Sequence, residues 1–375
     1  MNEEFTSLGL MSGTSGDGVD ASIIKSDGKT KYEVIKDEYF EYDEDIYQKI
    51  HDIKDKIHNL EGLNKFKEEL SILEREITLF HATVAKKFII GKKIDLIGFH
   101  GHTVYHNPSE KVSKQIGNGN LLSKLLKKKI IFNFRQNDIK NGGEGAPLTP
   151  IFHQIIAIQK KIKLPLCILN IGGISNITII DKPSEIYKNL KSKDIGPGNC
   201  LIDKWVRKNS KQKFDLDGTL ASRGIKNEII LEQAQELFSN RKNKNINTFD
   251  VNDFDVSFAR GLSLEDGVAT LTHFTGTILG EVLNSILFKE SDKDWKILLC
   301  GGGRKNKVLV DIIKKNCSKK YTIESIDNYD VNGDFVESQA FAFLAIRSTL
   351  NLPITFPSTT RCIKPSIGGE IIEFK

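Results

Sequence analysis

The order of apolar and polar positions predicts an α/β chain that begins with a strand meander. Short apolar or alternating runs are separated by glycine-containing turns, which is typical of antiparallel strands; they cover residues 7–11, 19–25 and 32–42. Charged segments of helical length follow at 43–59 and 62–90. Apolar residues in the second segment recur at spacings of three and four, which indicates a helix with one buried face.

The strand, glycine turn, strand pattern returns in the second half of the chain. A strand over 165–170 is followed by the turn IGGISN and a strand over 177–181. Helices are expected from 199, over 224–239, over 263–289 and over 336–350, with a buried strand in WKILLCGGG. The repeat predicts two α/β domains, 1–148 and 149–375, on either side of a cleft. In the alternative arrangement, the C-terminal segment returns to the first domain.

Residues 137–150 are dense in glycine, proline and asparagine, and they end the predicted first half. Such a composition is found both in linkers and in ordered loops that carry function. The polar residues of this stretch favour an ordered loop at the cleft, and a linker is the alternative.

Composition and charge narrow the class of protein. The chain has 375 residues, 39% of them apolar, which is enough for two cores. Its 54 basic and 49 acidic residues are spread along the sequence, so no stripe for nucleic acid is predicted. The five cysteines form no CxxC pair, no signal peptide precedes the first strand, and no apolar run approaches bilayer length. A cytoplasmic protein without membrane or nucleic-acid partners is expected.

The seven residues from Ser12 to Gly18 are longer than a hairpin turn requires. Glycines allow close approach of the backbone to a ligand, and a concave row of N–H groups binds anions. Asp17 and Asp20 suit a loop that also handles Mg²⁺ through water. The loop therefore predicts phosphate binding, with a decorated hairpin as the alternative.

Two more glycine turns follow buried strands, in NIGGISN at 170–176 and CGGGRKN at 300–306. A glycine pair after a strand is common, but three such turns in one chain indicate phosphates held from both walls of the cleft. The third turn precedes a predicted helix, whose N-terminus can bind an adenosine or an α-phosphate.

Eight motifs in order along the chain resemble those of the anhydro-N-acetylmuramic acid kinases: MSGTSGDGVD, HGHTVYH, QIGN, FRQNDIKNGGEGAPL, NIGGISNIT, DIGPGNCLID, CGGGRKN and VESQAFAFLA. This family belongs to the sugar kinase, heat-shock-70 and actin superfamily. The resemblance implies an actin-like ATPase fold, with two ribonuclease H-like domains flanking a central cleft for ATP and substrate. The three glycine turns then become a first phosphate loop, a second phosphate loop and an adenosine loop.

The resemblance also implies the activity and the residues that serve it. The expected enzyme uses ATP and Mg²⁺ to open the 1,6-anhydro ring of anhydro-N-acetylmuramic acid with water and to phosphorylate O6, giving N-acetylmuramic acid 6-phosphate in cell-wall sugar recycling. Asp194 of DIGPGN corresponds to the general base. The expected ATP-binding residues are Gly13, Thr14, Ser15, Gly16, Asp17, Gly18, Val19, Asp20, Gly172, Gly173, Asn176, Gly301, Gly302, Gly303 and Asn306. The expected substrate-binding residues are His100, Thr103, Arg135 and Glu337.

Ordinary structural roles are the alternatives at several of these positions. Asp194 lies beside a Gly-Pro turn, where a helix N-cap or an Asx-turn would also use an aspartate. Arg135 can bind a carboxylate or phosphate with two parallel hydrogen bonds, or form a surface ion pair. Glu337 opens the last helix, where the helix dipole alone favours an acidic residue. The histidines 100, 102 and 106 lack further ligands at zinc spacing, so polar lining of the cleft is expected and no metal site.

The sequence departs from the family at four places. Gly16 replaces a larger apolar residue, His102 replaces a glutamine, Ile195 replaces a threonine, and the segment 239–257 is altered. Two other functions stay open: a different sugar or acid kinase on the same scaffold, and a non-catalytic ATP-driven binding module of the actin or chaperone kind. The oligomeric state is also open, with a homodimer as one alternative.

Overall fold

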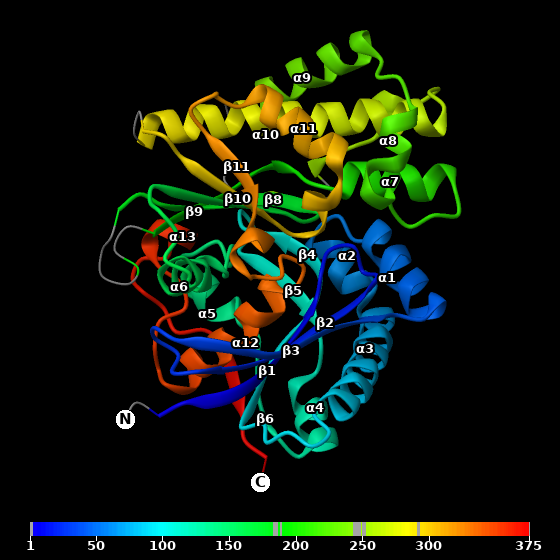
Figure 1. The fold of residues 1–375 in the computed structure, drawn as a ribbon. Coiled ribbons are helices and arrows are strands. Elements are labelled where there is room, and N and C mark those ends of the chain that lie inside the picture. The colour runs from blue at the N-terminus through cyan, green and yellow to red at the C-terminus, as the bar shows by residue number, and fades with distance from the viewer. Residues whose placement is uncertain are drawn as a thin grey trace. The chain divides into compact units, whose positions relative to one another are not determined.

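A computed structural model describes residues 3–182, 187, 190–242, 249, 253–290 and 293–374. The chain forms two compact units, shown in Figure 1. Unit 1 comprises Met1–Ile162, Glu185–Lys191 and Phe335–Lys375, and unit 2 comprises Lys163–Ser184 and Ser192–Asp334.

These bounds differ from the expected ranges 1–148 and 149–375. Residues 149–162 belong to unit 1 because their helix packs there, with Phe152 meeting the ring of Tyr32 at 4.9 Å and that of Phe343 at 5.5 Å between centroids. The C-terminal segment from Phe335 also lies in unit 1.

Unit 1 is built on one seven-stranded sheet in the order β12-β6-β4-β1-β2-β3, with β5 paired to β4. Its strands are β1 (Phe5–Ser12), β2 (Gly18–Ser26), β3 (Tyr32–Glu41), β4 (Leu96–Asn107), β5 (Val112–Ile116), β6 (Lys129–Phe132) and β12 (Glu370–Ile372). Its helices are α1 (Glu44–Lys56), α2 (Leu60–Lys65), α3 (Lys67–Phe88), α4 (Gly119–Leu126), α5 (Gln136–Lys140), α6 (Pro150–Gln159), α12 (Val336–Thr349) and α13 (Pro357–Thr360).

The alternation of side chains along β1 explains how this sheet is covered. Leu8 and Leu10 point into a core formed with α1 and α3, and both are fully buried. Gly9 faces the other way. A Cβ at this position would overlap the carbonyl oxygen of Ser338, so the glycine lets α12 lie directly on the sheet.

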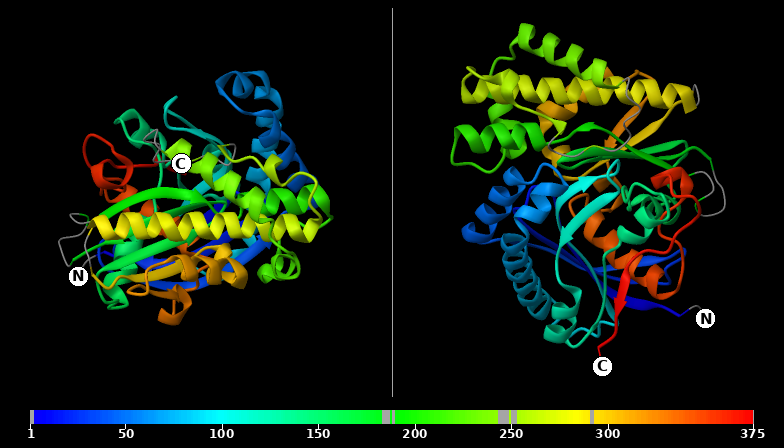
Figure 2. Two further views of the ribbon diagram at one scale, coloured as in Figure 1. Left: turned by 90° about the horizontal axis from the view of Figure 1, so that it is seen from above. Right: turned by 180° about the vertical axis from the view of Figure 1, so that it is seen from behind.

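Unit 2 has a five-stranded sheet in the order β11-β10-β7-β8-β9. The strands are β7 (Leu166–Ile171), β8 (Ile174–Ile180), β9 (Leu190–Pro197), whose first two residues belong to unit 1, β10 (Lys296–Cys300) and β11 (Thr322–Ser325). The helices are α7 (Cys200–Asn209), α8 (Thr219–Arg223), α9 (Glu228–Lys242), α10 (Leu264–Glu290) and α11 (Lys307–Asn316). The long yellow helix in both views of Figure 2 is α10, against which the other four helices pack.

The two sheets share one strand order. In unit 1, β1 pairs antiparallel with β2 and parallel with β4, which pairs parallel with β6. In unit 2, β7 pairs antiparallel with β8 and parallel with β10, which pairs parallel with β11. The predicted duplication is confirmed, and the fold is α/β with two ribonuclease H-like units.

Several expected elements differ from the observed ones. The helix predicted over 62–90 is divided at Phe66 into α2 and α3, and the one over 224–239 is preceded by the separate α8. The structure also contains β5 and β9, two strands that the sequence analysis did not predict. No helix within the described residues is long and apolar enough to cross a membrane.

Candidate active site

The first glycine loop, residues 13–17, joins β1 to β2 in unit 1. The N–H of Gly16 donates to the carbonyl of Gly13 at 3.1 Å, and the hydroxyl of Ser15 donates to Asp17 at 2.6 Å. The carbonyl of Asp17 accepts from the N–H of Tyr42 at 2.9 Å. The loop is therefore held as a tight turn, with Thr14 at its partly exposed tip.

Gly16 has a structural reason to be glycine in this chain. Its φ is +64°, and an added Cβ would lie 2.8 Å from Cγ2 of Ile50 and 3.5 Å from Cε1 of His102. The larger residue that the family usually has would not fit without movement of α1. The departure at Gly16 is thus matched by the side chain of Ile50.

The remaining residues of the predicted ATP motif lie in β2. Val19 is fully buried in the core, so its side chain serves packing. A Cβ at Gly18 would overlap the carbonyl of Phe40 in β3. Asp20 is half-buried and pairs in register with Met11 and Tyr39.

Helix α1 brings a cation to this loop that the sequence analysis missed. Nζ of Lys54 donates to the carbonyl oxygen of Thr14 at 2.7 Å. Nε2 of His51 lies 3.7 Å from the position of an added Cβ on Gly16. No local signal singles out Lys54 in the sequence, because charged residues recur along the whole of α1.

Strand β4 carries three buried histidines next to the loop strand. Burial and the charge of Arg135 lower the pKa of His100 well below its usual range, and burial lowers that of His106 to about 3. His102 lies in register with Ser12, and its Nδ1 is 3.1 Å from the Ser12 hydroxyl. These histidines are therefore neutral at pH 7, and the described residues contain no group of three or more His, Cys, Asp or Glu arranged to hold a metal.

Arg135 contacts His100 as one part of a connected polar network. Its Nε and Nη2 lie 3.3 and 3.1 Å from Nε2 of His100, whose Nδ1 lies 2.9 Å from the carbonyl of Gly101. The imidazole accepts from the guanidinium and donates to that carbonyl, which fixes its tautomer. Nη1 of Arg135 donates to the carbonyl of Gly145 at 3.2 Å. Arg135 is therefore connected both to β4 and to the loop after α5.

Of the stretch 137–150, residues 137–140 belong to α5, and the loop that follows them is held by hydrogen bonds. Asp138 is 1% exposed and accepts from the N–H of Gly145 at 2.7 Å and from the hydroxyl of Thr360 at 2.7 Å. The N–H of Glu144 donates to the Thr360 carbonyl at 2.8 Å. Asp138 thus holds the backbone that in turn holds Arg135.

The other two predicted substrate residues also lie in unit 1. The hydroxyl of Thr103 in β4 accepts from Nε2 of Gln115 in β5 at 3.2 Å. Glu337 is half-buried in the first turn of α12. In the same helix, the ring of Phe341 lies 4.4 Å from that of His100 between centroids. Within unit 1, His100 and Arg135 are therefore in contact, and α12 packs against His100.

The second glycine turn, Gly172 and Gly173, lies between β7 and β8 of unit 2. Its two carbonyls accept from the N–H groups of Asn199, at 2.8 Å, and Gly198, at 2.9 Å. Because C=O and N–H point in opposite directions in a trans peptide, the following N–H groups face away from that segment. Oδ1 of Asn176 is buried and has no hydrogen-bond partner within the described structure.

The third glycine turn follows β10 at the same edge of the sheet, because β7 and β10 are parallel and Cys300 pairs with Asn170. Gly301 and Gly303 are packed so closely against β7 that a Cβ on either would overlap Ile171 or Asn170. Around Gly302, the nearest atom to an added Cβ is 3.9 Å away, which leaves space for a ligand. The turn opens a 3-10 helix, Gly302–Lys305, rather than α11 directly.

Asn306, which was expected to bind ATP, caps α11 in this structure. Its Oδ1 accepts from the N–H of Leu309 at 3.0 Å, and the residue is 5% exposed. The side-chain oxygen is therefore used by the helix.

Behind the third turn, Arg304 binds two carboxylates. It donates to Asp327 at 2.7 and 2.9 Å, to Asp334 at 2.6 Å and to the Gly301 carbonyl at 3.1 Å. The guanidinium side chain is 6% exposed. This arrangement fixes the turn from the side of the protein, and the sequence analysis did not identify it.

Asp194 lies within β9, six positions before α7 begins, so it is neither the N-cap of α7 nor part of a helical turn. It is 9% exposed, and its Oδ2 accepts from the N–H of Phe249 at 3.0 Å. Phe249 belongs to the altered segment 239–257, of which residues 243–248 and 250–252 lie outside the described part. Asp194 is thus a largely buried carboxylate on β9, the strand beside β8. It lies four positions before Gly198, whose N–H donates to the second glycine turn.

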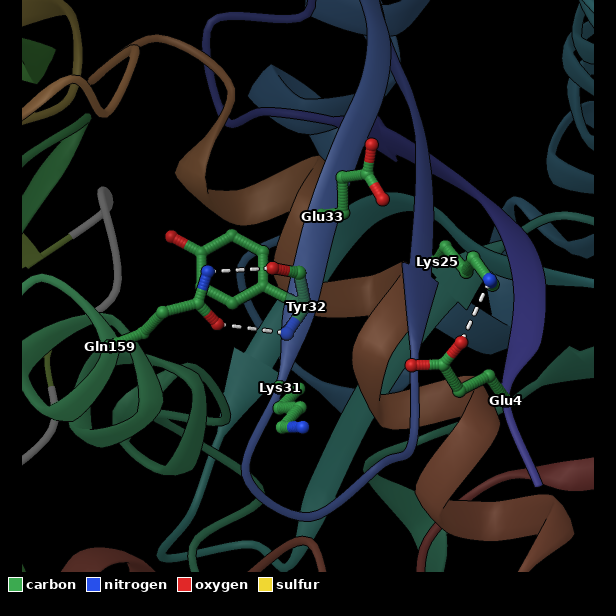
Figure 3. Close-up of a pocket in the computed structure, with 6 residues that line it drawn as sticks. All are labelled: Glu4, Lys25, Lys31, Tyr32, Glu33 and Gln159. Atoms are coloured by element: carbon green, nitrogen blue, oxygen red, sulfur yellow. Dashed lines mark hydrogen bonds and ion pairs between the residues drawn. The ribbon is translucent and has the colours of Figure 1, made fainter. Parts of the chain in front are cut away.

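One cavity in unit 1 is lined by none of the predicted residues. It has a volume of about 350 Å³ and is lined by Glu4, Lys25, Lys31, Tyr32, Glu33 and Gln159, as Figure 3 shows. Glu4 pairs with Lys25 at 2.7 Å, and the Gln159 amide bonds both the N–H and the carbonyl of Tyr32 at 2.9 and 2.7 Å. These contacts join neighbouring segments of unit 1, so the side chains that line the cavity have a structural role.

Comparison with known proteins gives matches over almost the whole chain. The family model described as anhydro-N-acetylmuramic acid kinase matches residues 5–373. A protein of that name from Pelagibacter ubique (strain HTCC1062) is 52% identical over 375 residues, covering 100% of both chains. Another of that name, from Paramagnetospirillum magneticum (strain ATCC 700264 / AMB-1), is 35% identical over 370 residues, covering 97% of this chain and 98% of the relative.

Proposed function

This chain belongs to the anhydro-N-acetylmuramic acid kinase family, and from that premise we propose how its residues carry out the reaction. The enzyme is an ATP-dependent kinase. It opens the 1,6-anhydro ring of anhydro-N-acetylmuramic acid with water and phosphorylates O6, which gives N-acetylmuramic acid 6-phosphate for cell-wall sugar recycling.

Asp194 is the general base of the proposed mechanism. It accepts a proton from water while the water oxygen bonds to the anomeric carbon and the bond from that carbon to O6 breaks. The departing O6 takes the γ-phosphoryl group of ATP instead of a proton, and ADP leaves. One protein carboxylate is then sufficient, whereas inverting glycosidases require two. The single observation that supports this role best is the buried position of Asp194 with a main-chain N–H directed at its carboxylate.

The glycine turns have the proposed role of binding the nucleotide. In unit 1, Gly13–Asp20 offers N–H groups to the phosphates. In unit 2, the N–H groups after Gly172 and Gly173 are directed away from the GPGN segment, and Gly302 leaves space for close approach of a ligand. Asn176 has a buried oxygen available to a donor from the ligand. Val19 and Asn306 would act through their backbone and their neighbours, because their side chains serve the core and a helix cap.

Mg²⁺ is the proposed metal cofactor, and the acidic residues of the first loop fit it. Asp17 and Asp20 both act on Tyr39, whose pKa is raised first by burial and then by these carboxylates, so negative charge is concentrated beside the loop. Mg²⁺ keeps several waters and needs only one or two carboxylates besides phosphates. When bound, it would neutralise charge on the transferring phosphoryl group.

Arg135 and His100 are the proposed contacts for the sugar. Arg135 is fixed in place by two hydrogen bonds to His100 and one to Gly145, so its cationic plane is already oriented for the lactyl carboxylate of the substrate. Thr103 and Glu337 are the additional proposed contacts. A reducing, cytoplasmic location is proposed from the sequence, because the five cysteines are far apart and form no CxxC pair.

The test of this function is phosphate transfer measured with and without the sugar. ADP release and N-acetylmuramic acid 6-phosphate should appear together only when ATP and anhydro-N-acetylmuramic acid are both present. N-acetylmuramic acid, with its ring already open, is the matched control and should give much less product. ATP hydrolysis that is independent of the sugar would instead favour an ATP-driven binding module, and transfer to another sugar or acid would favour a different kinase.

A further inference from the structure

The first glycine loop has a basic side chain on its carbonyl side. Nζ of Lys54 lies 2.7 Å from the carbonyl oxygen of Thr14, which is a charge-assisted hydrogen bond. Lys54 comes from α1, whose buried residues Ile46, Ile50 and Ile53 pack in the core of unit 1. Packing thus fixes α1 in the core, and this restricts the position of the Lys54 ammonium group.

This hydrogen bond determines the direction of one peptide group. The peptide between Thr14 and Ser15 is trans, so its C=O and N–H point in opposite directions. With the carbonyl directed at Lys54, the N–H of Ser15 must point away from α1. The N–H of Gly16 is used within the loop, since it donates to Gly13 at 3.1 Å. The N–H of Ser15 is therefore the group whose direction Lys54 sets.

The charge of Lys54 acts on the surroundings of the loop as well as on one carbonyl. Burial lowers the pKa of His102 well below its usual range, and the nearby charges of Lys54 and His51 lower it further. His102 also contacts Ser12, at the start of the loop. A positive electrostatic potential at this position favours an anion on the N–H side of the loop.

We propose that Lys54 is a positioning residue for nucleotide binding, which fixes the Thr14–Ser15 peptide so that its N–H is presented to the phosphates of ATP. The inference rests on the proposed role of the first loop. It adds a residue from α1, outside every motif of the family resemblance, to the machinery that binds the nucleotide.

The test compares Lys54→Met, which keeps the aliphatic stem, with Lys54→Arg, which keeps the charge and the donor. Lys56→Met is the matched control, because Lys56 lies on the same helix and pairs with Glu69 at 2.9 Å. Loss of a charge-assisted hydrogen bond should raise the KM for ATP and the Kd for ADP about tenfold in Lys54→Met. The KM for the sugar should change less than about twofold, Lys54→Arg should recover most of the loss, and Lys56→Met should resemble the wild type.

Three outcomes would show that Lys54 does not position the loop for the nucleotide. An unchanged KM for ATP in folded Lys54→Met, a lowered Tm as its only defect, or an equal rise in both KM values would each overturn the proposal. If Lys54→Met does not fold, the same criteria apply to Lys54→Gln. The Kd for ADP, measured by calorimetry, tests Lys54 without turnover, whereas failure of the wild type to phosphorylate the sugar would contradict only the proposed function.

Discussion

The main-chain N–H of Phe249 donates a hydrogen bond to Oδ2 of Asp194 across 3.0 Å. Phe249 lies in the segment 239–257, where the sequence departs from the family, and its ring packs at 5.4 Å from that of Phe254 between centroids. The altered segment therefore still provides a contact to the proposed base. Because the donor is a main-chain N–H, this contact does not depend on the identity of the side chain at position 249.

Asp194→Asn should abolish product formation while ATP still binds. The amide has nearly the same shape as the carboxylate, but it cannot accept a proton from water at neutral pH. The decisive comparison is between turnover and the Kd for ATP in the same preparation. Turnover close to that of the wild type would reject Asp194 as the base, and loss of both properties together would indicate a structural defect.

Phe249→Pro should impair catalysis through Asp194 by removing the N–H donor. Without this hydrogen bond the carboxylate anion is less stabilised, so the acidic limb of the kcat/KM profile should move to higher pH. The loss in kcat/KM should be about tenfold to a hundredfold, as expected for one hydrogen bond to a charged group. Phe249→Leu is the control, because it removes the ring and keeps the donor. If Phe249→Leu moves the acidic limb equally, the ring rather than the N–H is responsible.

The duplicated core could be predicted from the sequence because its strands are strongly apolar and their turns contain glycine. Two of the strands at the edges of the sheets could not be predicted from the sequence. β9 lacks alternation and ends in Gly196 and Pro197, so nothing in its side chains indicates a strand, and it exists through main-chain pairing with β8. β12 is only three residues long and depends on antiparallel pairing with β6. Such strands are determined by the neighbour that they pair with.

The glycine turns of the candidate site were identifiable, and the residues that support them were not. Arg304 stands inside CGGGRKN, yet its partners Asp327 and Asp334 are far along the chain, and no local spacing connects them. Lys54 belongs to a helix whose sequence reads as an ordinary charged surface. Asp138 could be read as one more polar loop residue, although it is buried and holds Gly145 and Thr360. These contacts join distant segments and require the fold to be known.

Gly16→Ala should destabilise the protein more than Gly13→Ala. At Gly16 the φ of +64° is unfavourable for alanine, and the new Cβ would lie 2.8 Å from Ile50. These two effects together should lower the free energy of unfolding by about 2 to 3 kcal/mol. At Gly13 the nearest atom to an added Cβ is 3.7 Å away, so stability should change little. Urea unfolding of both variants provides the measurement. Equal losses of unfolding free energy would show that Ile50 and α1 move easily to accommodate the new Cβ.

Arg304→Met should weaken both the fold of unit 2 and nucleotide binding. Burial raises the pKa of Asp327, but hydrogen bonds from Arg304 and Ser325 outweigh this and hold it well below the usual range. Without the arginine, Asp327 and Asp334 lose the guanidinium that they share, although Asp334 keeps Lys305. The cost should be about 2 to 3 kcal/mol, because both carboxylates are partly exposed. The Tm should fall and the KM for ATP should rise. A lowered pKa contributes its full stability above the unfolded value of 3.8, and this stability is lost as the pH falls towards the folded pKa. The wild-type advantage should therefore decrease progressively below about pH 4.

Lys305→Met is the control for Arg304, because Lys305 shares Asp334 at 2.5 Å but is 51% exposed. An exposed pair contributes about 0 to 1 kcal/mol, so this variant should remain close to the wild type. If Lys305→Met and Arg304→Met lose equal stability, burial of the Arg304 guanidinium does not explain its contribution to the free energy of unfolding. If Arg304→Met lowers the Tm and leaves the KM for ATP unchanged, the cluster supports the unit without setting the glycine turn.

Buried histidines should make the free energy of unfolding depend on pH in the range where carboxylates titrate little. Burial lowers the pKa of His81 to about 4 and those of His106 and His153 to about 3, against an ordinary value of 6.5. Between these values the unfolded chain binds protons that the folded chain excludes. Stability is therefore highest above pH 6.5 and falls as the pH decreases, by up to about 1.4 kcal/mol per pH unit for each histidine.

His81→Gln should reduce this pH dependence by about one proton between pH 5 and 7. The imidazole of His81 bonds the Ile77 carbonyl at 2.8 Å through Nδ1, a contact that a glutamine amide can replace without titrating. The measurement is the slope of the unfolding free energy against pH from urea titrations, which is independent of any constant loss caused by the substitution. An unchanged slope in His81→Gln would mean that His81 accepts a proton in the folded protein, and that its burial is relieved by a local opening of α3.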